Sequence, residues 1–170
     1  MLGVSVEVAA KPGRAERPAL MADSLWGTTP RQSIEALCGQ RGTPAVLREC
    51  VALLGGADTD PAIVAALAGP AAPRFLDAPE DQRYWLRVWG ARGLLWALAA
   101  PGAPAEVAPE VVEALVGGLV DQHWRVREMV LKVVARYELD DAQPAIEPLL
   151  TDENTRVRTA AARALRVLTR

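Results

Sequence analysis

The sequence contains few of the residues that build metal centres or disulfide frameworks. Among its 170 residues there are two cysteines, Cys38 and Cys50, and one histidine, His123. A disulfide-stabilised fold needs more cysteines in a smaller chain. No pair of these three residues has the spacing of metal ligands. We therefore expect two buried free thiols, no metal site and a reducing, cytoplasmic location.

Long apolar segments are also missing. No uninterrupted apolar run approaches the roughly 18 residues that a helix needs to span a bilayer. The N-terminal apolar stretch carries Glu7 and has no basic residue before it, so it is a poor secretory signal. We expect a protein that makes no contact with a membrane.

The overall charge is close to zero. The chain has 19 basic and 21 acidic residues and a formal net charge of −2, with 51% hydrophobic residues. Disordered and fibrous classes are excluded by this composition, and the length suits one domain with a sizeable core. Arginine predominates among the basic residues, since Lys11 and Lys132 are the only lysines in the sequence.

Proline and glycine divide the chain into helical segments. Residues 1–28 are expected to form a flexible tail, within which Met21 is an alternative to Met1 as the natural start. Residues 29–170 form one domain, in which the first helix opens at Pro30 and stops between Gly39 and Gly42. The periodicity predicts further helices over 45–54, 63–67, 82–99, 109–120, 124–137, 142–150 and 155–168. No segment alternates as strands do, so we predict an all-α fold of successive helix pairs.

The chain also contains an internal repeat. Residues 86–94, 126–134 and 157–165 align at offsets of 40 and 31 residues. Each copy has an acid six residues before an arginine, and a second basic residue five residues after that arginine. These residues are Asp81, Arg87 and Arg92, then Asp121, Arg127 and Lys132, then Asp152, Arg158 and Arg163.

The last copy, with Leu149, Leu150 and Asp152 before Val157 and Arg158, resembles a HEAT repeat. Its short spacing is similar to that of the short bacterial HEAT-like repeats of the phycobilisome-lyase type. Three such units cover residues 61–170, and residues 29–56 read as a fourth, degenerate unit. The resemblance implies an α-solenoid of about four helix pairs behind an N-terminal tail.

The resemblance also implies that the Asp–Arg pair is structural and spans the turn inside each unit. It therefore assigns six residues to the scaffold: Asp81, Arg87, Asp121, Arg127, Asp152 and Arg158. A stripe on each second helix is expected to form the core, and its small residues should let neighbouring helices approach closely. The stripes are Leu86, Gly90, Gly93 and Ala97; Val126, Val130, Val133 and Tyr137; and Val157, Ala161, Ala164 and Leu168.

Charge is distributed unevenly between the helices. Residues 82–98, 123–137 and 154–170 carry twelve basic residues and one acidic residue, a net charge of +11, which leaves −13 on the remainder. In helix-pair solenoids the second helices line the surface where extended binding sites form. The columns beside the core stripe supply the candidate binding residues Trp85, Trp89, Arg92, Trp96, Arg125, Lys132, Arg136, Arg156 and Arg163.

Arginine and tryptophan dominate the energetic centres of protein interfaces. The leading hypothesis is therefore a non-enzymatic adaptor that binds the acidic surface of a partner protein. The alternative is a nucleic-acid-binding module, with arginine for phosphates and indole rings for bases. HEAT-like DNA glycosylases place a carboxylate between such tryptophans, whereas residues 82–99 contain no Asp or Glu. The spacing of the tryptophans is equally typical of packing between repeats.

Signatures of catalysis are scarce. We expect His123, at the start of a helix, to be a cap or a surface residue, and no Ser or Cys has a base partner nearby in the sequence. Gly117 and Gly118 lie inside an apolar helix and resemble no phosphate-binding loop. We therefore predict neither catalytic activity nor a cofactor.

Overall fold

The computed structural model describes residues 29–170, which form α-helices and short 3-10 helices, with no strand in that range. The first two helix pairs are α1 (Pro30–Arg41) with α2 (Thr43–Leu54), and α3 (Pro61–Ala68) and α4 (Ala72–Leu76) with α5 (Tyr84–Ala97). The last two are α6 (Pro109–Leu119) with α7 (Trp124–Tyr137), and α8 (Gln143–Ile146) with α9 (Thr155–Leu168). The expected tail, residues 1–28, lies outside the described residues.

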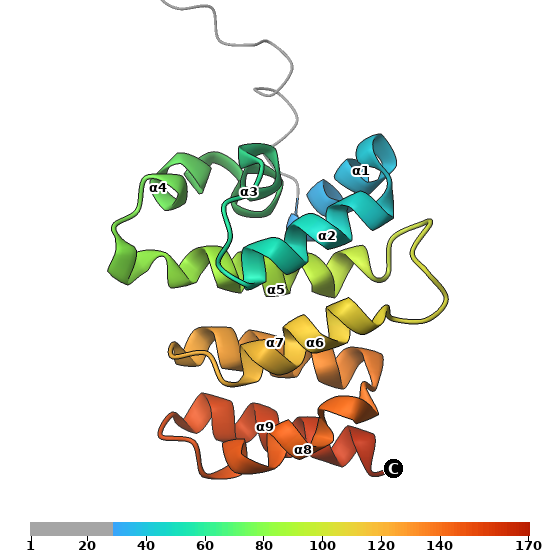
Figure 1. The fold of residues 1–170 in the computed structure, drawn as a ribbon, viewed down its shortest axis with the longest axis vertical. Coiled ribbons are helices and arrows are strands. Elements are labelled where there is room, and N and C mark those ends of the chain that lie inside the picture. The colour runs from blue at the N-terminus through green and yellow to red at the C-terminus, as the bar shows by residue number, and fades with distance from the viewer. Residues whose placement is uncertain (1–28) are drawn as a thin grey trace, which may run out of the picture.

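The helix pairs stack one on another along the long axis of the molecule (Figure 1). Helix α2 packs on α5, α5 on α7 and α7 on α9, so the second helices of all four pairs form one continuous stack. Helices α1 to α4 lie at one end, and α9 with the C-terminus lies at the other. Each pair packs mainly on its neighbours, and α2 of the first pair also contacts α6 of the third. Such a stack of helix pairs is an α-solenoid, which confirms the predicted fold class.

The predicted start signals act as expected at the first helix. The Thr29 hydroxyl accepts a hydrogen bond from the Gln32 amide at 3.3 Å, and the Gln32 side chain accepts one from the Thr29 amide at 2.9 Å. This reciprocal pair satisfies two amides that the helix leaves free. The helix ends at Gly42, whose φ of 84° strongly favours glycine.

Two elements differ from the prediction. The helix predicted over 142–150 is broken into α8 and two 3-10 turns, Asp140–Ala142 and Glu147–Thr151. Pro148 has no N–H to continue the helical bonding, and its ring crowds the preceding turn. Conversely, α4 forms where proline suggested a break, because Pro73 lies in the first turn, where a helix needs no N–H donor.

Glycines bring α2 and α5 into direct backbone contact. A Cβ added at Gly90 would lie 2.5 Å from the Leu54 nitrogen and 2.8 Å from the Cys50 carbonyl oxygen. At Gly93 it would collide with the Cys50 sulfur. The small residues of the core stripe therefore allow the close approach that the sequence predicted. Cys38 and Cys50 are buried free thiols, also as predicted, and burial raises the pKa of Cys50 far above its usual range.

Arginines join the second unit to the third, and the third to the fourth, through carboxylates. Arg87 donates from Nε to Asp121 at 2.6 Å and from Nη2 at 3.2 Å. Arg127 donates to Asp152 in the same way, at 2.8 Å and 3.1 Å. We call these two bidentate pairs the Arg–Asp ladder. Both partners of the second pair are buried, with 10% of the Arg127 side chain and 5% of the Asp152 side chain exposed.

The prediction that each Asp–Arg pair closes its own unit is therefore wrong. Within a unit the arginine bonds to main-chain oxygens of the turn: Arg127 Nη1 donates to the carbonyls of Asp121 at 2.7 Å and Gln122 at 3.1 Å. Arg158 does the same with the Asp152 and Glu153 carbonyls. The six-residue spacing brings the arginine back to these carbonyls, while the carboxylate accepts from the preceding unit. Within residues 29–170, Asp81 makes no ion pair.

The electrostatics of Asp152 follow from this arrangement. Burial opposes ionisation of its carboxyl group. The hydrogen bonds from Arg127 and from the Asn154 amide, with the charges of Arg127 and Arg158, outweigh burial and lower the pKa of Asp152 below its ordinary value. The folded protein therefore favours the ionised form.

The glycine contact predicts opposite effects for two equivalent substitutions. Gly90→Ala should lower the free energy of unfolding by about 1–3 kcal/mol, because the new methyl group meets backbone atoms that cannot move aside. Gly117→Ala should raise it by about 0.5–1 kcal/mol, because a Cβ there has no neighbour within 4 Å and alanine favours the helix. Urea unfolding of both variants checks the difference, and equal effects would contradict the close approach of α2 and α5.

The ladder predicts a pH-dependent loss of stability in Asp152→Asn. Because the folded pKa is lowered, the carboxylate stabilises the fold above the unfolded pKa of about 3.9, and this contribution is lost as the pH falls through the folded pKa. At pH 7 the free energy of unfolding of the variant should be lower than that of the wild type by at least about 2 kcal/mol, since the Arg127 charge stays buried without its counter-charge. The difference from wild type should shrink below about pH 4.

Asp77→Asn is the matched control for this experiment, because the Asp77 side chain is exposed at the end of α4. Its melting temperature should follow that of the wild type throughout the titration. An Asp152→Asn variant that is as stable as this control at pH 7 would show that the ladder contributes nothing.

Candidate functional site

The candidate residues predicted from the sequence lie on three consecutive helices of the stack. Helical spacings of three, four and seven residues place each set on one side of its helix. The contacts described below join the three sets into one surface, which we call the α5–α7–α9 face. It comprises Trp85, Trp89, Arg92 and Trp96 of α5, Arg125, Lys132 and Arg136 of α7, and Arg156 and Arg163 of α9.

Arginine and indole side chains alternate across the unit boundaries of this face. The guanidinium carbon of Arg125 lies 5.0 Å from the centre of the Trp85 ring and 4.5 Å from that of the Trp124 ring. The guanidinium carbon of Arg156, from the next unit, also lies over the Trp124 ring, 5.6 Å from its centre. Such cation–π contacts hold the guanidinium groups in place while leaving their N–H donors free. Trp124 is a member of this row that the sequence reasoning did not include.

The same pairing occurs farther along the helices. The guanidinium carbon of Arg136 lies 5.5 Å from the centre of the Trp96 ring, and that of Arg31 from α1 lies 5.9 Å from it. Arg92 lies 4.7 Å from the Trp89 ring centre. Partial burial lowers the pKa of Arg92 from its ordinary value. Arg31 was also absent from the predicted set, because its helix lies in another repeat.

The tryptophans have a packing role as well. Trp85 and Trp89 are half-buried and contact Phe75 of α4, with ring centres 6.0 Å and 5.7 Å apart. The Trp89 indole nitrogen is buried and has no hydrogen-bond partner among the described residues. Packing and exposure, the alternatives that the sequence left open, are thus combined: one part of each ring packs on the core and another part carries a guanidinium group.

The arginines of the face differ from those of the ladder in their partners. Arg92, Arg125, Arg136, Arg156 and Arg163 form no ion pair with any residue of the range 29–170. Lys132 is the exception on this face, since it bonds to Glu128 at 2.9 Å. The face therefore presents an excess of positive charge that no acidic residue in the described chain neutralises.

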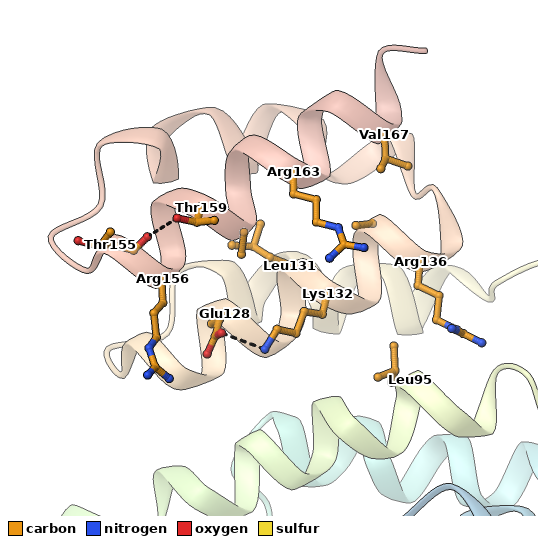
Figure 2. Close-up of a pocket in the computed structure, with 12 residues that line it drawn as sticks. Leu95, Glu128, Leu131, Lys132, Arg136, Thr155, Arg156, Thr159, Arg163 and Val167 are labelled. Carbon is orange, nitrogen blue, oxygen red and sulfur yellow. Dashed lines mark hydrogen bonds and ion pairs between the residues drawn. The ribbon is translucent and has the colours of Figure 1, made fainter.

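A groove lies within this face, between α7 and α9 with α5 at its edge (Figure 2). Its volume is about 610 Å³. Lys132 and Arg136 of α7 and Arg156 and Arg163 of α9 are among its lining residues. Aliphatic side chains that were not among the predicted binding residues also line it: Leu95, Leu131, Ala135, Ala160 and Val167.

His123 caps α7 beside the face. Its Nδ1 accepts a hydrogen bond from the Arg125 amide at 3.3 Å, as Asn154 accepts one from the Arg156 amide in the next unit. The imidazole stacks on Tyr84 of α5, with ring centres 3.4 Å apart. Burial and then the charge of Arg125 lower the pKa of His123, so the folded protein favours the neutral imidazole. The predicted role as a helix cap is confirmed.

Within residues 29–170, no three His, Cys, Asp or Glu side chains are grouped as a metal ion would require. No helix in the same range has the length and hydropathy needed to cross a membrane.

A family model described as HEAT repeats matches residues 73–166, more than half of the chain. The matched region contains both arginines and both carboxylates of the Arg–Asp ladder, and all of the α5–α7–α9 face. No curated protein and no solved structure matches the chain.

The cap predicts a pH dependence that one substitution removes. Because the folded pKa of His123 is lowered, the unfolded chain binds a proton first as the pH falls below about 6.5, and stability falls with it. His123→Asn keeps the capping acceptor, as Asn154 demonstrates in the next unit, and cannot be protonated. The wild type should therefore lose more stability than this variant between pH 7 and pH 5, measured by urea unfolding. Parallel pH profiles would contradict the assignment.

Proposed function

Because the chain belongs to the HEAT repeat family, whose members generally serve as protein-interaction scaffolds, we propose that it is a non-enzymatic adaptor that binds the acidic surface of a partner protein through the α5–α7–α9 face. One observation carries this proposal. The ladder arginines Arg87 and Arg127 are paired with carboxylates, whereas five arginines of the face have none within the described chain.

The chemistry of these arginines suits carboxylates of a partner. A guanidinium group presents its donors as a planar fork that fits a carboxylate at two points. Arg125, Arg136 and Arg156 already lie over aromatic rings, so little side-chain freedom is lost when a partner binds. The positive charge also attracts an acidic partner before contact, which raises the rate of association.

The indole rings favour a protein over a nucleic acid. Stacking of bases needs exposed ring faces. Here guanidinium groups lie over Trp85, Trp96 and Trp124, and Phe75 covers part of Trp85. The aliphatic lining of the groove likewise suits apolar side chains rather than phosphates. Nucleic-acid binding is the alternative that the following experiment separates from the proposal.

Reversing three exposed charges of the face tests the proposal. The variant Arg136→Glu, Arg156→Glu, Arg163→Glu changes residues that form no ion pair within the described chain. The probe is a fluorescein-labelled peptide of about 16 residues composed of glutamate and alanine, long enough to form a helix on binding. We expect the reversal to weaken binding by more than about tenfold, measured by fluorescence anisotropy. Wild-type binding should weaken with added salt, because exposed charges are screened.

The matched control variant is Arg48→Glu, Arg166→Glu, Arg170→Glu, which has the same net charge and alters exposed residues outside the groove. It should bind the peptide nearly as the wild type does, and circular dichroism should show equal helicity in all three proteins. Equal weakening in both variants would contradict the proposed face. Tighter binding of a single-stranded or duplex oligonucleotide of the same charge, lost in the first variant alone, would favour the nucleic-acid alternative.

A further inference from the structure

The groove between α7 and α9 has an apolar lining that attraction between charges does not require. The apolar lining residues are Leu131 and Ala135 of α7, Ala160 and Val167 of α9 and Leu95 of α5. The volume of about 610 Å³ lies in the range of sites that enclose a ligand group. The groove therefore has both the space and the surface for a bulky apolar side chain.

Cations border this lining on two opposite sides. Lys132 and Arg136 are one helical turn apart on α7, and Arg156 and Arg163 are two turns apart on α9. At 1.5 Å per residue, these pairs span about 6 Å and about 10 Å along their helices. A ligand in the groove is thus within reach of positive charge from both walls.

The remaining polar groups of the groove add no competing negative charge. Glu128 is the one acidic residue among the lining residues, and it is bonded to Lys132. Thr159 donates its hydroxyl to the Thr155 carbonyl. Arg136, Arg156 and Arg163 have no carboxylate from any described residue, so acidic groups of an occupant can pair with them.

We propose that the groove receives one bulky apolar side chain from an acidic segment of the partner protein, while carboxylates on either side of that side chain bond to Arg136 and Arg163. This inference rests on the proposed function and specifies which segment of a partner the face recognises. The apolar side chain gains by leaving water, and the flanking carboxylates fix its position between the two walls. An acidic surface without such a side chain binds by charge alone and leaves the groove empty.

The probe is a pair of fluorescein-labelled peptides of about 16 residues, rich in glutamate, that differ at one central position. One peptide carries tryptophan there and the other carries alanine. We expect the wild-type protein to bind the tryptophan peptide at least about tenfold more tightly than the alanine peptide, because only the first fills the groove.

Two protein variants remove the space without changing any charge. Ala160→Leu fills the groove from α9, and Ala135→Leu fills it from α7. Each should bring the affinity for the tryptophan peptide down to that for the alanine peptide. Ala162→Leu is the matched control, since it is the same substitution on α9 at a residue that does not line the groove. Circular dichroism and melting temperature establish that each variant is folded. Because Ala160 and Ala135 lie on different helices, the two variants test the groove independently.

The outcomes separate this inference from the proposed function. A wild-type preference for tryptophan that disappears in the Ala160→Leu or Ala135→Leu variant and survives in Ala162→Leu supports it. Equal binding of both peptides by the wild type overturns the groove inference while the charge-based function stands. Failure of both peptides to bind at about 100 µM overturns both. An unchanged preference in a folded groove-filling variant places the apolar contact elsewhere and overturns the inference.

Discussion

The bidentate bond from Arg127 to Asp152 is the interaction on which the arrangement of the repeats depends. It joins α7 to the turn before α9, and the same bond from Arg87 to Asp121 joins α5 to the turn before α7. Burying such a pair is costly unless every polar atom finds a partner. Here the remaining donor of Arg127 bonds to two carbonyls of its own turn, and Asp152 also accepts the Asn154 amide. One arginine thus fixes its own turn and the position of the next unit.

This scaffold divides the arginines of the second helices into two groups. Those that directly follow a residue of the core stripe, such as Arg87 and Arg127, lie on one flank of the stripe and bond to the following unit. Those in the neighbouring columns, such as Arg125, Arg136 and Arg163, lie on the opposite flank and have no carboxylate within the described chain. The periodicity that builds the stack therefore also lines up unpaired cations across α5, α7 and α9. Repetition alone thus produces the face that we propose as a binding surface, and the aliphatic groove between α7 and α9 is the local feature that, in this proposal, distinguishes one acidic partner from another.

Much of the fold could be predicted because the signals are local. The bounds of α7 and α9 agree with the sequence prediction, since His123 and Asn154 cap them and the apolar period is regular. The connection around Pro148 could not be predicted well, because short 3-10 turns depend on how α8 packs. The partner of each ladder carboxylate also escaped the sequence reasoning. A six-residue spacing suggested a bond within the unit, whereas the distance between units decides which arginine reaches the carboxylate.

The candidate face was predictable to a similar extent. Helical spacing identified its columns, but the sequence could not reveal that Arg125 lies between Trp85 and Trp124, because those rings belong to different units. Leu131 and Ala135 gave no signal, since residues that line a groove have the same apolar character as core residues. The structure thus confirms the architecture, while the binding role of the face remains a proposal that follows from its unpaired charge.

A double-mutant cycle tests the central claim, that carboxylates bind arginines of the neighbouring unit. It compares the free energy of unfolding of Arg127→Ala, Asp152→Ala and the double variant with that of the wild type. A second cycle combines Arg158→Ala with Asp152→Ala in the same way. We predict a coupling energy of about 2 kcal/mol or more between Arg127 and Asp152, and less than about 0.5 kcal/mol between Arg158 and Asp152. A larger coupling in the second cycle would show that the carboxylate closes its own unit and would contradict the account.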